Sequence, residues 1–155
     1  MSRRALSSIV LGGLVAGAFD ITYATVFSYF RSGVAPSRIL QSVASGLLGS
    51  AAFEGGVPTA ALGLALHFGI ALVAAAIYVF ASQYLPILVL RPVLFGSVYG
   101  IAIYAVMNLV VLPLSRFPRK VSFPLPVLIT GLLVHMFLIG VPIALAARRA
   151  YKVPG

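Results

Sequence analysis

Five polar side chains inside long apolar segments are the residues of this chain best able to support chemistry. They are Asp20, His67, Tyr104, Asn108 and His135. Counted from one end of each segment, Asp20 is tenth, and His67, Tyr104 and His135 are each eleventh. Ten residues of helix rise roughly 15 Å, half of a hydrocarbon core of about 30 Å. In helices that cross a membrane, these groups would share one depth near the midplane, with Asn108 one turn nearer the surface.

A carboxyl group at this depth constrains what the helix around it can do. An aspartate at the centre of a membrane helix costs about 2.5–3.5 kcal/mol, so it must face protein, pair with a partner or carry a proton. Histidine titrates near neutral pH, and aspartate and histidine in membranes commonly form ion pathways. Our preferred hypothesis is therefore a proton relay or a passage for a small solute, lined by the five residues. We assign no catalytic residue.

Two alternatives are compatible with the same residues. In the first, His67 and His135 are axial ligands of a non-covalent haem b, or join Asp20 around a metal ion, since two histidines and one carboxylate are a known iron ligand set. In the second, the polar layer only sets helix register, and the chain is an accessory or assembly subunit of a larger membrane complex, or a homo-oligomer. We therefore assign no cofactor from the residues alone.

Motifs of soluble enzymes are missing from the sequence. It contains no G-x-S-x-G elbow, P-loop or H-E-x-x-H zinc motif. With two acidic residues in the whole chain, one of them deep in an apolar segment, hydrolysis by a carboxylate pair is not favoured. The residues favour a role other than catalysis.

The composition is typical of an integral membrane protein. Of 155 residues, 61% are hydrophobic and 8% are charged, whereas soluble domains have about 45–50% and 25%. The formal charge of +9 comes from small basic groups between apolar segments, which indicates the ends of membrane spans rather than a nucleic-acid-binding face. The chain has no cysteine, so disulfides and thiolate metal sites are excluded.

Four segments have the length of about 20 apolar residues that crosses a bilayer. We predict one all-helical membrane domain over 1–155, with spans at 7–29, 57–79, 92–114 and 125–147. We expect the first span to be retained rather than cleaved as a signal peptide, because its apolar run continues past Asp20 to Phe30.

A fifth, shorter helix is predicted at 39–53. Apolar residues recur there at helical spacing among glutamine and serine, and Ser37 is the predicted N-cap. A helix of this length reaches only about 22 Å, which is too short to cross. The segment is therefore predicted to be interfacial or re-entrant.

The basic residues predict cytoplasmic termini by a margin of one. The side of the termini carries six cations, and the other side carries five. The six are Arg3, Arg4, Arg91, Arg148, Arg149 and Lys152, and the five are Arg31, Arg38, Arg116, Arg119 and Lys120. Cytoplasmic loops carry the excess of Lys and Arg.

Two pairs of segments indicate an internal duplication. Residues 10–17 and 93–100 match at five of eight positions, and Gly63 to His67 and Gly131 to His135 share G-L-x-x-H. The two offsets, 83 and 68, differ by 15, the length of 39–53. We interpret this as a helical hairpin duplicated in parallel, with one helix inserted in the first copy and a pseudo-two-fold axis along the membrane normal.

Glycines within the repeated segments predict close contacts between helices. The G-x-x-x-G pairs remove side chains one turn apart, so a neighbouring backbone can approach. Further glycines lie one turn before each histidine. The glycines concerned are Gly13, Gly17, Gly96, Gly100, Gly63 and Gly131.

Several of these segments together resemble known proteins. They are A-P-S-R-I-L-Q-S-V-A-S-G-L-L-G at 35–49, L-A-L-H-F at 64–68, M-N-L-V-V-L-P at 107–113, and His135-Met136 with Arg148-Arg149. From about Gly12 to Arg149, and most specifically over 36–68, the chain resembles a group of uncharacterised bacterial four-span inner-membrane proteins and is loosely similar to the YagU-like family. The resemblance implies a bacterial inner-membrane location and four spans. It assigns no reaction, ligand or catalytic residue.

Overall fold

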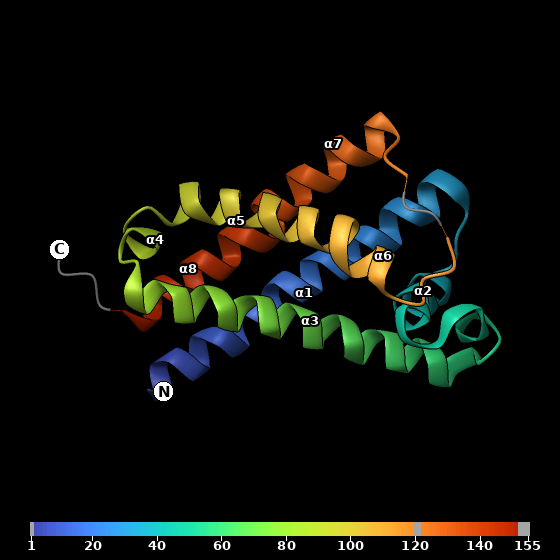
Figure 1. Cartoon of the computed structure of the whole chain (residues 1–155), viewed down its shortest axis with the longest axis horizontal. Coiled ribbons are helices and arrows are strands. Elements are labelled where there is room, and N and C mark those ends of the chain that lie inside the picture. Colours follow the sequence, from blue (N-terminus) through green and yellow to red (C-terminus); the bar gives the residue numbers. More distant parts are fainter. Residues whose placement is uncertain (1, 120–121, 152–155) are drawn as a thin grey trace.

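Four long helical segments make up most of the molecule (Figure 1). The computed structural model describes residues 2–119 and 122–151, and regular structure in these ranges is helical throughout. Four segments are long and apolar enough to cross a membrane: Arg3–Ser32, Gly56–Tyr84, Pro92–Leu114 and Leu125–Ala150. The predictions of an all-helical chain and of four spanning helices are therefore confirmed by length and composition. Lys120 and Lys152 lie outside the described residues.

The first two spans are uninterrupted helices that extend beyond their predicted apolar cores. In α1 (Arg3–Ser32), the Ser2 hydroxyl accepts a hydrogen bond from the Ala5 N–H at 3.2 Å, and Gly33 ends the helix with a φ of 65°. α3 (Gly56–Tyr84) leads into the single turn of α4 (Ile87–Leu90). A helix continues through polar residues until it meets a stop such as Gly33, so its ends lie beyond the apolar run.

The third and fourth spans each contain a π-helical segment. The third is α5 (Pro92–Val106), η2 (Met107–Val111) and α6 (Leu112–Leu114), and the fourth is α7 (Leu125–Val134), η3 (His135–Gly140) and α8 (Val141–Ala150). Each π-helical segment lies just before a proline, Pro113 or Pro142. Proline lacks an N–H and crowds the carbonyl four residues earlier, so we attribute the widened turns to these prolines.

The short helix between the first two spans is present with different bounds. It comprises α2 (Pro36–Leu48) and a 3-10 turn, η1 (Gly49–Phe53), because Gly49 adopts a φ of 66° that ends the α-helix. The prediction that Ser37 is the N-cap is wrong. The N-cap is Ala35, which makes no side-chain capping bond, because proline at the first helical position starts the helix one residue before Ser37.

Glycines lie where helices approach most closely. A Cβ built on any of the six glycines singled out in the sequence would lie within 3.0 Å of another helix, or would overlap it. The closest neighbours are Leu72 for Gly13, Phe68 for Gly17, the Gly140 carbonyl for Gly96, the His135 carbonyl for Gly100, the Leu40 carbonyl for Gly63 and the Tyr104 ring for Gly131. The spans α1 and α3, and α5 and η3, therefore pack backbone against backbone.

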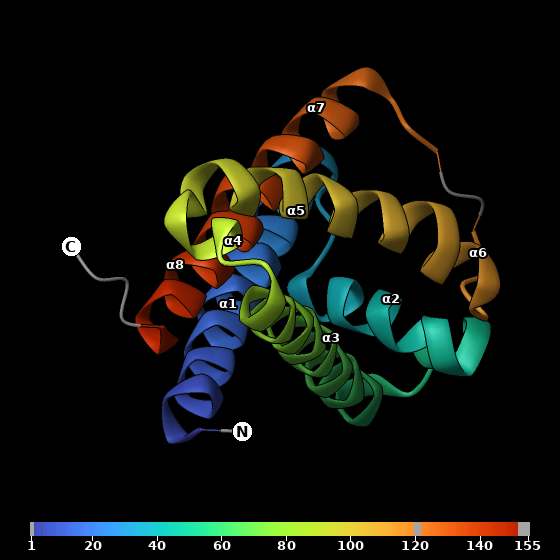
Figure 2. The same cartoon turned by 60° about the vertical axis from the view of Figure 1, so that its left-hand side comes forward.

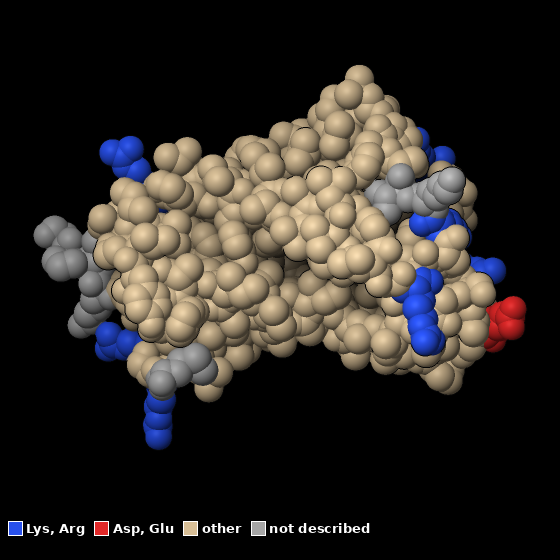
Figure 3. All heavy atoms as spheres, viewed as in Figure 1, with Lys and Arg blue, Asp and Glu red and all other residues tan. Residues whose placement is uncertain are grey.

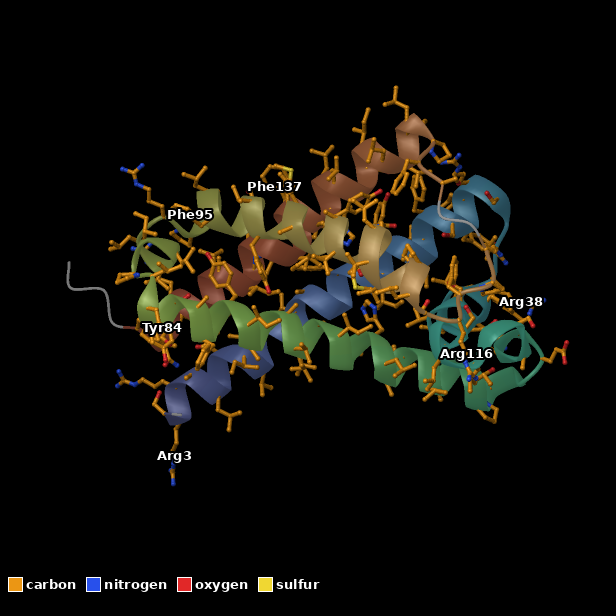
Figure 4. The ribbon with its side chains drawn as sticks, in the orientation of Figure 1. Arg3, Arg38, Tyr84, Phe95, Arg116 and Phe137 are labelled. Atoms are coloured by element: carbon orange, nitrogen blue, oxygen red, sulfur yellow. The ribbon has the colours of Figure 1, made fainter. Side chains whose placement is uncertain are left out.

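Charged side chains gather at the two ends of the molecule, and an apolar surface separates them (Figure 3). Arg3 and Tyr84 lie at one end, here called the terminal end, and Arg38 and Arg116 lie at the other, the loop end (Figure 4). Large apolar side chains face outward between the ends; Phe137, for example, is 50% exposed. An apolar belt between charged ends is what a lipid environment requires.

The buried core lies toward the terminal end. It is built mainly from small and branched side chains of α1, α3, α4, η3 and α8: Ala5, Ala16, Ala75, Tyr78, Val79, Val89, Ile139, Ile143, Ala144 and Ala147. Three tyrosine hydroxyls donate to backbone carbonyls there: Tyr78 to Leu88 at 3.0 Å, Tyr99 to Ala74 at 2.8 Å and Tyr151 to Val79 at 3.0 Å. Toward the loop end, α3 and α7 diverge (Figure 2).

Candidate functional site

A cleft of about 980 Å³ lies at the loop end, between α1, α2 and α7. Its walls come from α1, α2, η1 and α7, from Tyr104 of α5, and from the start of η2 and η3. Asp20 and Arg31, both on α1, line it. Eleven residues of helix separate them, a rise of about 16 Å. The cleft therefore reaches from the charged rim to the depth at which the sequence analysis placed the polar layer.

Four of the five predicted site residues line this cleft, and the fifth lies directly behind it. Tyr104, Asn108 and His135 line the cleft together with Asp20. His67 is not among the lining residues, but its Nδ1 lies 4.0 Å from Oδ2 of Asp20. Tertiary packing thus brings side chains from all four spans to one place.

The orientation of His67 is set by a backbone carbonyl of α1. Its Nε2 lies 2.8 Å from the carbonyl oxygen of Gly17. Because a carbonyl only accepts, Nε2 must carry the hydrogen, and Nδ1 is the nitrogen directed at Asp20. The His67 side chain is 12% exposed and that of Asp20 is 26% exposed. The carboxyl group thus has a mostly buried imidazole on one side and the open cleft on the other.

In His135 the other ring nitrogen, Nδ1, contacts a backbone carbonyl. Its Nδ1 lies 2.9 Å from the carbonyl oxygen of Gly131, one turn earlier, so Nδ1 carries the hydrogen and Nε2 presents a lone pair. The Tyr104 ring meets the imidazole edge-on, with ring centroids 5.0 Å apart. Gly131 makes this contact possible, since a Cβ there would lie 2.7 Å from Cε2 of Tyr104.

Asn108 is anchored to its own helix. Its Nδ2 donates to the Tyr104 carbonyl at 2.9 Å. This bond occupies the carbonyl one turn earlier, where the α-helix gives way to η2. The amide oxygen remains as an acceptor for the cleft. π-helical turns are frequent at functional sites, and here each of the two turns contains a site residue, Asn108 or His135.

The donor set does not fit a haem or metal held by the two histidines. Axial ligation requires each imidazole to offer a lone pair to one iron. His67 donates Nε2–H to Gly17 and turns Nδ1 to Asp20, whereas His135 offers Nε2 from the cleft side. Among the described residues, no group of three or more His, Asp or Glu side chains could hold a metal ion.

The arginines of the rim were named in the sequence analysis as basic residues on one side of the membrane and were not predicted as site residues. Arg31, Arg38 and Arg119 line the cleft with Phe27 and Phe53. One signal could have identified part of this wall, because Asp20, Tyr23, Phe27 and Arg31 recur at helical spacing on one face of α1. Arg38 and Arg119 carry no such signal, since they lie on α2 and in the segment between α6 and α7.

The chain was compared with protein-family models, curated proteins and solved structures, and no match was found in any of the three. The function is therefore inferred from the geometry of the cleft.

Proposed function

We propose that this protein is a proton-linked carrier that admits a small solute into the cleft from the loop end. One observation carries the proposal: the intramembrane carboxyl group, Asp20, lies between an imidazole and a cleft whose lining residues extend to the loop end, whereas the terminal half of the molecule is packed. A carrier requires such a one-sided path to a site near the midplane. A purely structural polar pair would have no need of the open cleft beside it.

Asp20 and His67 together are suited to hold one proton without net charge. Because Nε2–H donates to Gly17, one further proton can reside either on Nδ1 of His67 or on the carboxyl group of Asp20. Both arrangements, a neutral acid with a neutral imidazole and a carboxylate with an imidazolium, have zero net charge. The two groups are 4.0 Å apart, so a movement of about 1 Å brings them into hydrogen-bond contact. Loss of the proton leaves a carboxylate facing the cleft.

The packed terminal end supports the carrier mechanism over an open channel. The small-residue core and the three tyrosine hydroxyls close that half of the molecule. Passage therefore requires a second arrangement in which the terminal end opens. The π-helical turn η3 joins the cleft residue His135 to the core residue Ile139, and η2 contains the cleft residue Asn108. A change of helix geometry in these turns would therefore act on the cleft, and in η3 also on the core.

Equivalent glycine contacts in the two halves support a parallel duplication, in which two similar hairpins move against each other. In each half, the second glycine of G-x-x-x-G contacts the residue after the histidine, and the first glycine contacts the residue five after the histidine. Gly100 lies closer still to the carbonyl of His135. The contacts are Gly17 with Phe68 and Gly13 with Leu72 in the first half, and Gly100 with Met136 and Gly96 with Gly140 in the second. The offsets are those of the sequence repeats, 83 and 68.

We further propose that the protein lies in a bacterial inner membrane with cytoplasmic termini, as the resemblance and the basic residues suggest. The cleft then opens away from the cytoplasm.

We propose that α2 is re-entrant, because Leu40 packs on Gly63, the eighth residue of α3. Seven residues of helix correspond to a depth of about 10 Å.

The test measures proton entry into proteoliposomes that contain a pH-sensitive dye, driven by an acidic outside buffer at zero membrane potential. A mixture of small organic solutes is supplied outside, because a carrier moves its proton together with its solute. The wild-type protein should acidify the lumen faster than protein-free liposomes do. Asp20→Asn removes the titratable oxygen at nearly constant volume, and we expect it to reduce the rate to that of protein-free liposomes.

Glu54→Gln is the matched control, because it makes the same chemical change at an exposed turn outside the cleft. It should acidify the lumen at the wild-type rate. A wild-type rate equal to that of empty liposomes, or an Asp20→Asn rate equal to wild type, would refute the proposal. Circular dichroism of each variant in detergent checks that the helices are intact.

A further inference from the structure

Three arginines from three separate segments surround the entrance of the cleft. Arg31 is in the last turn of α1, Arg38 is in the first turn of α2, and Arg119 lies between α6 and α7. The loop end carries a fourth arginine, Arg116, which does not line the cleft. Its backbone N–H donates to the Gly46 carbonyl at 2.9 Å. The loop end therefore has arginines inside and outside the cleft.

Two of the cleft arginines share one aromatic ring. The guanidinium carbon of Arg38 lies 5.3 Å from the centroid of Phe53, and that of Arg119 lies 5.5 Å from the same centroid. The Arg38 Nη1 also donates to the Phe53 carbonyl at 2.7 Å. These contacts hold two like charges beside one ring at the entrance, although their mutual repulsion opposes that arrangement.

These charges have no carboxylate partner in the described part of the chain. The acidic residues are Asp20 and Glu54. The one ion pair found among described residues joins Asp20 to His67. Guanidinium groups that contact a cleft and lack an acid within 4.0 Å are available to an incoming anion.

We propose that the solute carries a phosphate monoester, bound by Arg31, Arg38 and Arg119. This inference depends on the cleft of the proposed function and names its substrate class. A phosphate monoester carries a charge of about −1.5 to −2 at neutral pH and three acceptor oxygens, and guanidinium groups bind it in a bidentate manner. Three cations around one entrance match this charge better than they match a single carboxylate.

The rest of the cleft fits the organic part of such a molecule. Apolar side chains line the wall between entrance and floor, among them Phe27, Ile39 and Val127. At the floor, Tyr104 and Asn108 offer hydrogen-bonding groups. A dianion that enters with a proton at Asp20 carries less net charge into the membrane than the dianion alone, which gives the proton linkage a physical reason.

The experiment measures phosphate binding to the full chain in phosphatidylcholine nanodiscs by isothermal titration calorimetry. The soluble probes are glycerol 3-phosphate and, as a carboxylate comparison, succinate. A parallel set of nanodiscs contains phosphatidic acid, and bound lipid is counted by mass spectrometry. We expect a phosphate probe to bind at least tenfold more tightly than succinate, and Arg38→Gln with Arg119→Gln to weaken it at least tenfold.

Arg116→Gln is the matched control, since it removes the same charge from the same end outside the cleft, and it should change the affinity less than twofold. Equal losses from Arg116→Gln and from the cleft variants would mean general surface attraction and would overturn the proposal. So would equal binding of succinate, or no binding of either phosphate probe to folded wild-type protein. Binding of glycerol 3-phosphate identifies a soluble source, and enrichment of phosphatidic acid alone identifies a lipid headgroup; either result supports the proposal.

Binding is measured without a proton gradient, so this test and the flux test can fail separately. Asp20→Asn should retain phosphate binding within about threefold while it abolishes proton entry, because a small change at the floor leaves the entrance intact. Retained binding with no proton flux in the wild-type protein would refute the carrier and leave the anion site in place. Proton flux without phosphate binding would refute the anion site and leave the carrier in place.

Discussion

At the scale of residues, the two histidines differ because different carbonyls fix their tautomers. His67 donates Nε2–H across the helix interface to Gly17, whereas His135 donates Nδ1–H within its own helix to Gly131. Both acceptors are glycines, and their missing side chains leave room for a neighbouring aromatic ring, Phe68 beside Gly17 and Tyr104 beside Gly131. One imidazole is therefore directed at Asp20 and the other at the cleft. The two imidazoles thus present different ring nitrogens within one site.

Gly100 gives a residue-scale prediction about packing. A methyl group there would overlap the backbone carbonyl of His135, which cannot move without shifting the helix. We expect Gly100→Ala to destabilise the protein by about 1–3 kcal/mol, the typical cost of overpacking. The measurement is the temperature at which half of the detergent-solubilised protein no longer elutes as a monodisperse peak.

Gly69→Ala is the control for this prediction. Gly69 lies in α3 and has no heavy atom within 4 Å of a built Cβ. Because alanine is the better helix former, this variant should be as stable as the wild-type protein or slightly more stable. If both variants lose stability equally, tight packing at Gly100 is not the cause.

At the scale of elements, α2 packs against α3 and forms one wall of the cleft. It is held by a buried side chain, because the Gln41 amide donates to the Gly56 carbonyl at 3.0 Å and Gln41 is 5% exposed. It is also held at Gly63, where a side chain would overlap the carbonyl of Leu40. Arg38, one of the arginines at the entrance, depends on this attachment for its position.

Gln41→Met tests the attachment of α2. Methionine has a similar shape and no amide, so it removes the bond to Gly56 at a cost of about 1 kcal/mol. We expect faster hydrogen–deuterium exchange throughout α2 and unchanged exchange in the middle of α3, measured by mass spectrometry. Ser37→Ala, at an exposed position on the same helix, should leave exchange unchanged. Equal exchange in Gln41→Met and wild type would show that this bond does not hold α2.

At the scale of the whole molecule, the two ends have different packing. The terminal end contains the core of alanine, valine and tyrosine side chains, and the loop end contains the cleft. Toward the loop end, α3 and α7 also diverge (Figures 1 and 2). A solute that enters at the loop end therefore meets a closed core beyond the polar floor.

The absence of cysteine from the chain makes the membrane topology directly measurable. Ser2→Cys places a thiol at the terminal end, and Glu54→Cys places one at the loop end, both at exposed positions. In intact cells, a membrane-impermeant maleimide should label Glu54→Cys and not Ser2→Cys, and both should react after permeabilisation. Labelling of both in intact cells would contradict the arrangement of the four spans, and the reverse pattern would contradict cytoplasmic termini.

Local composition and helix geometry were enough to predict several features from the sequence. The four spans follow from the length and hydropathy of each segment. The common depth of Asp20, His67 and His135 in a membrane, counted along helices with a fixed rise, stays a prediction. The bounds of the short helix were less predictable. Its start at Pro36 and its change at Gly49 depend on single backbone conformations.

Only the tertiary structure decided which of these side chains meet. The distance between Asp20 and His67 depends on how closely α1 and α3 approach, and the pairing of Tyr104 with His135 depends on the space above Gly131. Arg31, Arg38 and Arg119 line one cleft because α1, α2 and the segment between α6 and α7 meet at the loop end. Hydropathy is a property of each segment alone, whereas a cleft is a property of the space between segments, which packing sets.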